Sequence, residues 1–379
     1  MTTQTSPGTT PPAPPSAPVP RLRADRGRWA LSSHGVRTVA RLELRQRVRS
    51  SRWQLMLGLF FATIGVLSGL TMWVSGFDDG SGDFLYGAVA WLVLTLGLLV
   101  APSLTSTSVN GDRGAGTLAP LQMTLLTPAE IAVGKLLAGW LTALAFLGTA
   151  IPFLLLAMVP GGTGVGRFLV TTLMMALVLL AVCAIAIGWS AVMARSVSSA
   201  VMTYLTTAFL CIGTLILFGL SVPLVTSDER VRVLENPPLP QDFDYTTDIP
   251  VEDCVETTAV RSVTRTDATW WLLAANPYVV VADAAPGGDG GDAFYLIKTG
   301  VRAAQAGAEE PVNECWASNV TGTGTAVGDP FGGGLAAQGV PVWPFGLAIN
   351  LGLGALGIAL AVRRLSTPVA RLPRGTRIA

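Results

Sequence analysis

Six long apolar stretches decide what this chain can fold into. They cover residues 53–75, 84–104, 131–159, 167–194, 199–222 and 343–362. As helices, all of them are long enough to cross a hydrocarbon core of about 30 Å. Charged residues make up only 13% of the chain, against about 25% in an ordinary soluble protein. We therefore expect an all-α membrane protein with six transmembrane helices, five of them within residues 53–222.

Ionisable residues are almost absent from these stretches. None of them carries a charge in its interior except Lys135, which lies near the start of the third stretch, where its ammonium group could reach the headgroups. Carriers driven by protons or sodium usually keep charged groups in the middle of the membrane, so we expect energy to come from a partner. No P-loop occurs, since Gly134-Lys135 is followed by leucine. With His34 as the single histidine, we expect no catalytic site, no metal and no cofactor.

Charge asymmetry predicts the orientation. If the N-terminus is cytoplasmic, the cytoplasmic side holds 18 basic and four acidic residues, and the outer side holds seven basic and 20 acidic residues. The positive-inside rule then places both termini in the cytoplasm, including a basic tail over residues 363–379. Residues 1–30 begin with a run rich in proline and threonine, which we expect to be disordered. We expect the cell membrane as the location.

An amphipathic helix is predicted just before the first span, within residues 31–52. One stripe is basic and consists of Arg37, Arg41, Arg45 and Arg49. An adjacent apolar stripe has the same spacing and consists of Val36, Ala40, Leu44 and Val48. This pattern favours a helix in the membrane interface with arginines near anionic headgroups. The alternative is an ordinary solvated helix.

Residues 223–342 form one long polar segment, which the orientation places outside as an extracytoplasmic domain. Within it, an apolar stretch over residues 270–281 is interrupted by Asn276-Pro277. We interpret this stretch as re-entrant or interfacial, the alternative being a seventh span. Cys254 and Cys315 would be expected to pair in an oxidising exterior, although sequence alone does not supply the geometry of a disulfide.

The connection between the second and third spans, residues 105–130, has two features. Leu118, Leu121 and Leu125 are spaced to face one way on a short helix. Thr127-Pro128-Ala129-Glu130 reads as a capping box with proline at the first helical position. Together they predict a short helix followed by a rigid corner into the third span. The alternative is that this is only a well-capped helix start.

Several short motifs give the chain a resemblance to bacterial ABC type-2 exporter permeases. They are Glu43-Leu44-Arg45-Gln46-Arg47, Ser51-Arg52-Trp53, Asp112-Arg113-Gly114, Gly116-Thr117-Leu118, Leu125-Leu126-Thr127-Pro128, Glu130-Ile131, Gly134-Lys135-Leu136 and Asn276-Pro277. The sequence departs from the family at Asp112, where glutamate is more common, and at Ala119-Pro120, where an acidic residue is more common.

The resemblance implies a permease that dimerises with a second permease subunit, identical or different, and pairs with ABC ATPase subunits. It implies export of a lipophilic or bulky substrate, with no nucleic acid as partner. The ATPase would contact the arginine-rich helix and a coupling loop that comprises Asp112, Arg113, Thr117, Leu118, Leu121, Leu125, Thr127, Pro128 and Glu130. The alternative function is a membrane-anchored assembly or sensory protein whose outer segment binds a ligand or partner.

Overall fold

The structure of the protein is a computed structural model. It describes residues 27–75, 82–118, 126–159, 163–235, 255–288, 292–308, 312–313 and 339–366. Leu121, Leu125, Cys254 and Cys315, as well as most of the two terminal tails, lie outside these residues. The predictions made for them therefore stay predictions.

Six helices among the described residues are long and apolar enough to cross a membrane. Their segments agree with the predicted all-α membrane protein. The spans are formed by α2 (Ser51–Ser75), α3 (Gly82–Thr105), α6 (Pro128–Met158), α7 (Val165–Val192), the continuous run of α8 (Ser196–Ala208), π-helix η1 (Phe209–Gly213) and α9 (Thr214–Ser221), and α15 (Trp343–Leu365). The molecule is thus a multi-pass membrane protein by the length and composition of its helices.

Helix α7 lies at the centre of the bundle, in contact with α3, α6, α8 and α15. Its contact with α15 is close because small residues meet there. A Cβ added to Gly188 would lie 2.5 Å from the Cα of Gly357, and Gly354 packs in the same way against Ala184. Small residues allow helix backbones to approach one another in membranes. The glycines of the last span therefore mark a helix contact, as their sequence pattern indicated.

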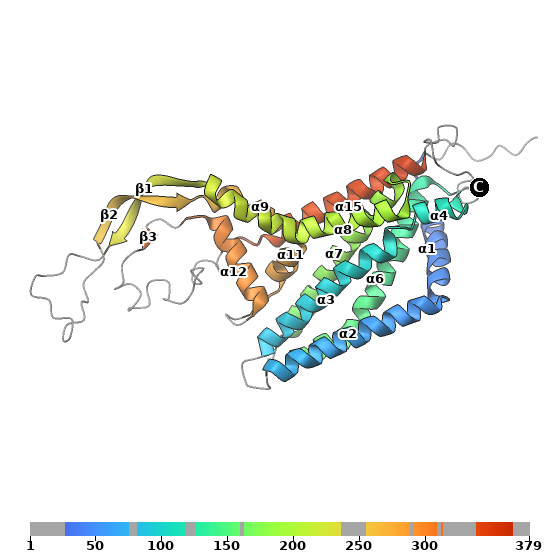
Figure 1. Ribbon diagram of the computed structural model, residues 1–379, viewed down its shortest axis with the longest axis horizontal. Helices are drawn as coiled ribbons and strands as arrows, with labels where there is room; N and C mark the ends of the chain where they lie inside the picture. The colour runs from blue at the N-terminus through green and yellow to red at the C-terminus, as the bar shows by residue number, and fades with distance from the viewer. Residues whose placement is uncertain are drawn as a thin grey trace, which may run out of the picture.

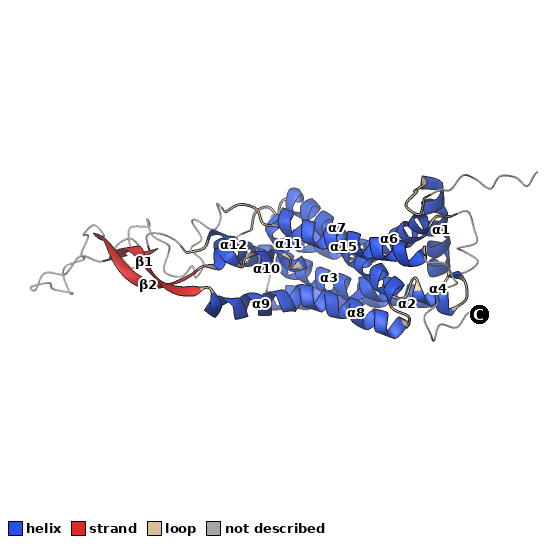
Figure 2. Cartoon of the chain, turned by 90° about the horizontal axis from the view of Figure 1, so that it is seen from above, coloured by secondary structure: helices blue, strands red, loops and turns tan. Residues whose placement is uncertain are grey.

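One end of the bundle carries α1 (Ser33–Val48) and α4 (Asn110–Gly114), next to the start of α6 and the end of α15 (Figure 1). We call it the α1 end. Seen from above, α1 and α4 again lie together at this end, opposite the strands (Figure 2). Residues that flank α4 form a separate apolar cluster here with residues of α6, α7 and α15; it includes Leu118, Ile131, Ile187 and Val362.

The opposite end, which we call the sheet end, contains short helices and a small sheet. The helices are η2 (Val222–Leu224), η3 (Thr266–Ala268), α10 (Trp271–Ala274), α11 (Pro277–Ala284) and α12 (Ala293–Ala306), and the strands are β1 (Thr226–Glu235), β2 (Val255–Thr264) and β3 (Val312–Asn313). β1 and β2 form an antiparallel hairpin with Thr226 opposite Thr264, β3 is parallel to β1, and the order is β2-β1-β3. The hairpin extends away from the helices (Figure 1). The sequence analysis did not predict this sheet.

The apolar stretch over residues 270–281 breaks at Asn276-Pro277, as predicted. Helix α11 begins at Pro277, has eight residues and packs against α7, α12 and α15. Eight helical residues span about 12 Å, far less than a hydrocarbon core. The stretch does not form a seventh span.

Candidate functional site at the α1 end

The first turn of α6 begins at a capping box. The Thr127 hydroxyl accepts a hydrogen bond from the Glu130 N–H at 3.2 Å, and the Glu130 carboxylate accepts one from the Thr127 N–H at 2.9 Å. Pro128 stands at the first helical position. These bonds satisfy N–H groups that a helix start leaves free. The predicted capping box is confirmed.

The same two side chains also hold the segment that leads into α1. The other carboxylate oxygen of Glu130 accepts a bond from the Ser32 N–H at 3.0 Å, and the Thr127 hydroxyl donates to the Ala30 carbonyl at 2.6 Å. Glu130 is only 1% exposed. A Cβ on Gly35 would lie 2.6 Å from the Glu130 carboxyl carbon, so the first turn of α1 approaches this carboxylate closely. The start of α6 thus holds the segment that leads into α1, although Ala30 and Thr127 are 97 residues apart.

Lys135 joins three elements. Its ammonium group, on α6, pairs with the carboxylates of Glu43 on α1 and Asp112 on α4, the latter at 2.5 Å. Lys135 is 1% exposed, so the expectation that it extends to the headgroups is wrong. The physical reason is that α1 and α4 bring two carboxylates to it, and a buried ammonium group needs such partners. We call Lys135, Glu43 and Asp112 the lysine triad.

Helix α1 packs on α6 through a face that differs from the predicted one. The buried residues are Gly35, Val39 and Ala40, and a Cβ on Gly134 would collide with Val39. Farther along this face, Arg47 approaches the Thr142 hydroxyl at 3.5 Å, and burial lowers the pKa of Arg47 while Glu43 opposes that shift.

The apolar stripe predicted for α1 is therefore only partly correct. Ala40 is buried, but Val48, at the other end of the stripe, is exposed. Arg37, Arg41, Arg45 and Arg49 are exposed on the outer side. The ion pair of Glu43 with Lys135 explains the rotation of the helix, because it turns the Glu43 side chain toward α6.

Helix α4 is also anchored to α7 and α8. Ser190 on α7 accepts hydrogen bonds from the N–H groups of Val109 and Asn110 at 3.0 and 3.2 Å. The hydroxyl of Ser199 on α8 donates to the Ser106 carbonyl at 2.6 Å. The segment after α3 is thus tied to two other spans, and Asp112 is held where it can reach Lys135.

The structure brings together some of the residues predicted for the coupling loop. Asp112, Thr127 and Glu130 are joined to α1 or α6 as described, and Leu118 is buried in the apolar cluster of this end. Thr117 is exposed and Arg113 is partly exposed. Sequence reasoning did not identify Glu43 and Lys135 as partners. The available signal was the one lysine inside an otherwise uncharged span.

A second charged cluster lies at the sheet end. Arg167, in the first turn of α7, pairs with Asp83 at the start of α3 at 3.0 Å and with Asp292, which caps α12. Arg167 is 4% exposed and Asp292 is fully buried. We call these three residues the arginine triad. Arg167 and Glu130 are buried in the first turns of their helices, so these charges lie at the ends of the spans and not in their middle.

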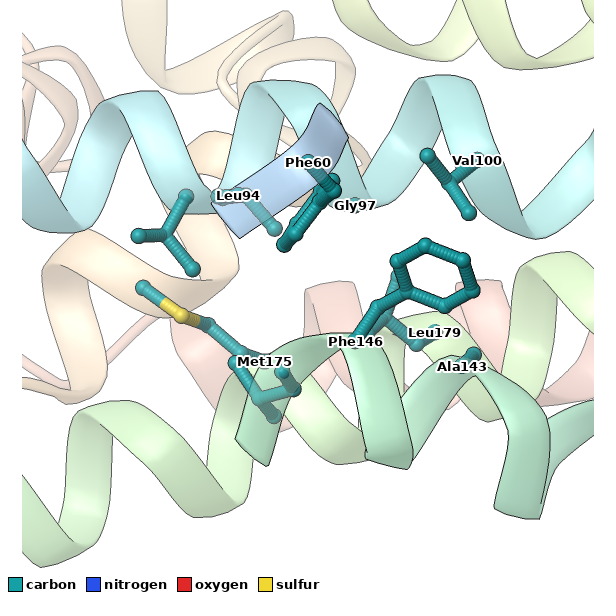
Figure 3. Close-up of a pocket in the computed structure, with 10 residues that line it drawn as sticks. Phe60, Leu94, Gly97, Val100, Ala143, Phe146, Met175 and Leu179 are labelled. Carbon is teal, nitrogen blue, oxygen red and sulfur yellow. The ribbon is translucent and has the colours of Figure 1, made fainter. Parts of the chain in front are cut away.

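The bundle interior contains one narrow apolar pocket of note between α2, α3, α6 and α7. Phe60, Leu94, Phe146 and Met175 are among its lining residues (Figure 3). Its interior room is about 10 Å³, which suffices for about one water molecule. In this conformation the pocket is too small for a molecule much larger than water.

No known protein family matches the sequence, and no curated protein matches it. Within the described part of the chain, no three His, Cys, Asp or Glu side chains gather in a way that could hold a metal ion. The arrangement of charges at the α1 end is therefore the main guide to function.

Proposed function

We propose that the chain is the permease subunit of an ABC transporter, which exports a lipophilic or bulky substrate with energy from a separate ATPase. The observation that carries this proposal is the lysine triad. It connects α1 and the short helix α4, the two elements expected to contact an ATPase, to the long helix α6. The family resemblance of the same segments supports the proposal independently of the geometry.

Transmission would follow these contacts. Movement of α1 or α4 changes the position of a carboxylate bonded to Lys135, and the capping box makes the start of α6 a stiff corner. Helix α6 has 31 residues and is about 46 Å long. It contacts α2, α3 and α7. A force at its first turns would thus reach three other spans.

The remaining parts of the proposal concern orientation and assembly. The arginine-rich α1 end would face the cytoplasm, and the sheet end would lie outside the cell membrane. The first span and the fifth are the least buried of the six inside the single chain. In each, only 17% of the most apolar segment is buried. Their exposed apolar faces would contact lipid and a second permease subunit.

The test uses the full chain purified with its bound partners from the membranes of cells that produce it. We expect a P-loop ATPase in the complex, with hydrolysis of Mg-ATP that vanadate inhibits. Lys135→Met should reduce hydrolysis and transport by about tenfold, a typical size for coupling between sites. The complex should stay assembled, and Lys135→Arg should retain part of the activity because it keeps the positive charge.

Two results would contradict the proposal. One is a purified, active complex without any ATPase. The other is a Lys135→Met variant that folds and couples hydrolysis to transport as the original chain does. Arg230→Gln serves as the matched control, since it removes one exposed positive charge from the sheet end.

The alternative function, a membrane-anchored sensory or assembly protein, is favoured by the hairpin. β1 and β2 extend beyond the helices (Figure 1), and β2 is an edge strand with one side not paired in the described sheet. Such an edge can bind a partner strand. A sensor kinase or enzyme in the purified complex, instead of an ATPase, would favour this alternative.

A further inference from the structure

The charged side chains of α1 are sorted onto two faces. Glu43 is the single acidic residue of this helix, and it points to Lys135, while Arg47 points to Thr142. The outer face therefore retains basic residues, namely Arg37, Arg41, Arg45 and Arg49, all exposed. Four residues advance a helix by about 6 Å, so these guanidinium groups form a row about 18 Å long. This outer face of α1 attracts anions.

An apolar surface begins where this row ends. Val48 in the last turn of α1 is 56% exposed, and Leu55 and Leu59 on the outer side of α2 are 73% and 66% exposed. Helices α1 and α2 meet at a corner, with only Arg49 and Ser50 between them (Figure 1). A shallow, open hollow of about 480 Å³ lies at this corner, lined by Leu44, Arg45, Val48 and Arg49. That volume is within the range of ordinary ligand sites.

We propose that this corner binds an anionic phospholipid. Its phosphate would lie between Arg45 and Arg49, its glycerol region over Leu44 and Val48, and its acyl chains along the outer face of α2. Guanidinium groups match phosphate oxygens through paired N–H donors. An acidic protein surface would match the arginines alone, whereas a phospholipid also matches the lipid-facing apolar side of α2 that adjoins them. Along this surface, a charged part is followed by a mixed part and then by an apolar part. A phospholipid has its phosphate, glycerol region and acyl chains in the same order.

The lipid would hold α1 from the outside, while Lys135 holds the same helix from the inside. Helix α1 is thus placed between two electrostatic contacts, one to the membrane and one to α6. The charge of the membrane would then affect how firmly α1 stays docked. This binding needs no ATPase, so it can be measured on the permease chain alone.

The experiment titrates the full chain, purified in neutral detergent, with phosphatidylglycerol or with phosphatidylcholine of the same acyl chains. Binding is followed by native mass spectrometry and by the melting temperature. Near a membrane, each arginine favours anionic lipid, and two of them predict a preference for phosphatidylglycerol of about 30-fold. The variant Arg45→Gln with Arg49→Gln should lose this preference. Replacement of both arginines by lysine should keep part of it and also shows that the fold tolerates changes here.

The matched control is Arg230→Gln with Arg232→Gln, which removes the same charge from exposed positions of β1. It should keep the preference. The proposal is wrong if the Arg45/Arg49 variant keeps the preference, or if inorganic phosphate alone raises the melting temperature as much as phosphatidylglycerol does. A variant that keeps lipid binding but loses a bound ATPase would show that these arginines bind protein. Such a result would overturn the lipid site and leave the proposed transport function intact.

Discussion

Both ends of the bundle bury a positive charge, but the carboxylates that neutralise it differ in exposure. Each end contains a buried basic residue near the first turns of a span, held by two carboxylates from other elements. At the α1 end, Lys135 is held by Glu43 and by Asp112, whose side chain is 31% exposed and belongs to a five-residue helix. At the sheet end, Arg167 is held by Asp83 and by the fully buried Asp292.

The chemistry of the two triads suggests different mobility. An ammonium group is a point charge on a flexible stem, whereas a guanidinium group is a planar fork that fixes the direction of its bonds. Asp292 is further fixed by the N–H groups of Phe294 and Tyr295 at the start of α12. Asp112 can reach water when it leaves Lys135. We infer that the sheet end is the rigid end and that the α1 end can rearrange.

The largest expected effect compares the two central cations. Arg167→Met leaves Asp292 buried without its charged partner, and loss of one member of a buried ion pair destabilises by about 3–5 kcal/mol. Lys135→Met should destabilise less, because Asp112 and Glu43 are partly exposed and can be hydrated. The measurement is the melting temperature of each purified variant. Equal losses for the two variants would contradict the distinction between a rigid and a mobile end.

The pH dependence of the Arg167→Met variant sharpens this comparison. Burial raises the pKa of Asp292, and Arg167 opposes that shift in the original chain. Without Arg167 the folded protein should bind a proton at Asp292 more readily than the unfolded chain does. Stability of the variant should therefore rise as pH falls toward the acidic range and decrease as pH rises above the pKa of the unfolded state. If the melting temperature of the variant shows the opposite trend, Asp292 is not the buried carboxylate that loses its partner in Arg167→Met.

The spans and the capping box could be predicted because both are local. Apolar length identifies a span, and Thr127 and Glu130 stand three residues apart. The triads could not be predicted, since Lys135 and Glu43 are 92 residues apart and Arg167 and Asp292 are 125 apart. No periodicity shows which distant carboxylate reaches a given cation. The reasoning about Lys135 assumed that its charge must go to water, and the folded chain instead supplies carboxylates.

The hairpin was missed for a different reason. Its strands belong to a long polar segment, and their short apolar pattern was overlooked. Val231 and Val233 alternate with arginines and are buried together with Val263. Such alternation is typical of a half-buried strand. The alternation over these few residues is therefore enough to predict β1.

A smaller effect tests whether the rigidity of the sheet end extends into the spans. The Asn276 side chain caps α11 by accepting from the Tyr278 N–H at 2.9 Å, and it donates to the Cys211 carbonyl in π-helix η1 at 2.7 Å. Asn276→Ala loses these two bonds and a third, which its amide donates to the Thr214 hydroxyl of α9 at 3.2 Å, and should destabilise by about 1–3 kcal/mol. Asn276→Ser keeps a cap but is too short to reach η1, so it should destabilise less.

Melting temperatures of the two Asn276 variants separate the cap from the contact with η1. If Asn276→Ser is as unstable as Asn276→Ala, the bonds to η1 and α9 carry the whole effect and the cap contributes nothing measurable. If neither variant differs from the original chain, the rigidity of the sheet end stops at the arginine triad.

The smallest effect is expected for an ion pair of good geometry without burial. Glu229 and Arg265 on the hairpin approach within 2.6 Å, and hydrogen bonds from Arg265 and then Ser227 lower the pKa of Glu229. A lowered pKa gives stabilisation that is present above the pKa of the unfolded state and is lost as pH falls through the folded value. Water and salt screen an exposed pair, so Glu229→Gln should leave the melting temperature unchanged at neutral pH. If this variant instead melted as early as Arg167→Met, short distance rather than burial would determine the strength of these pairs. The contrast between the two ends would then lose its basis, because the exposure of Asp112 and the burial of Asp292 are what distinguish them.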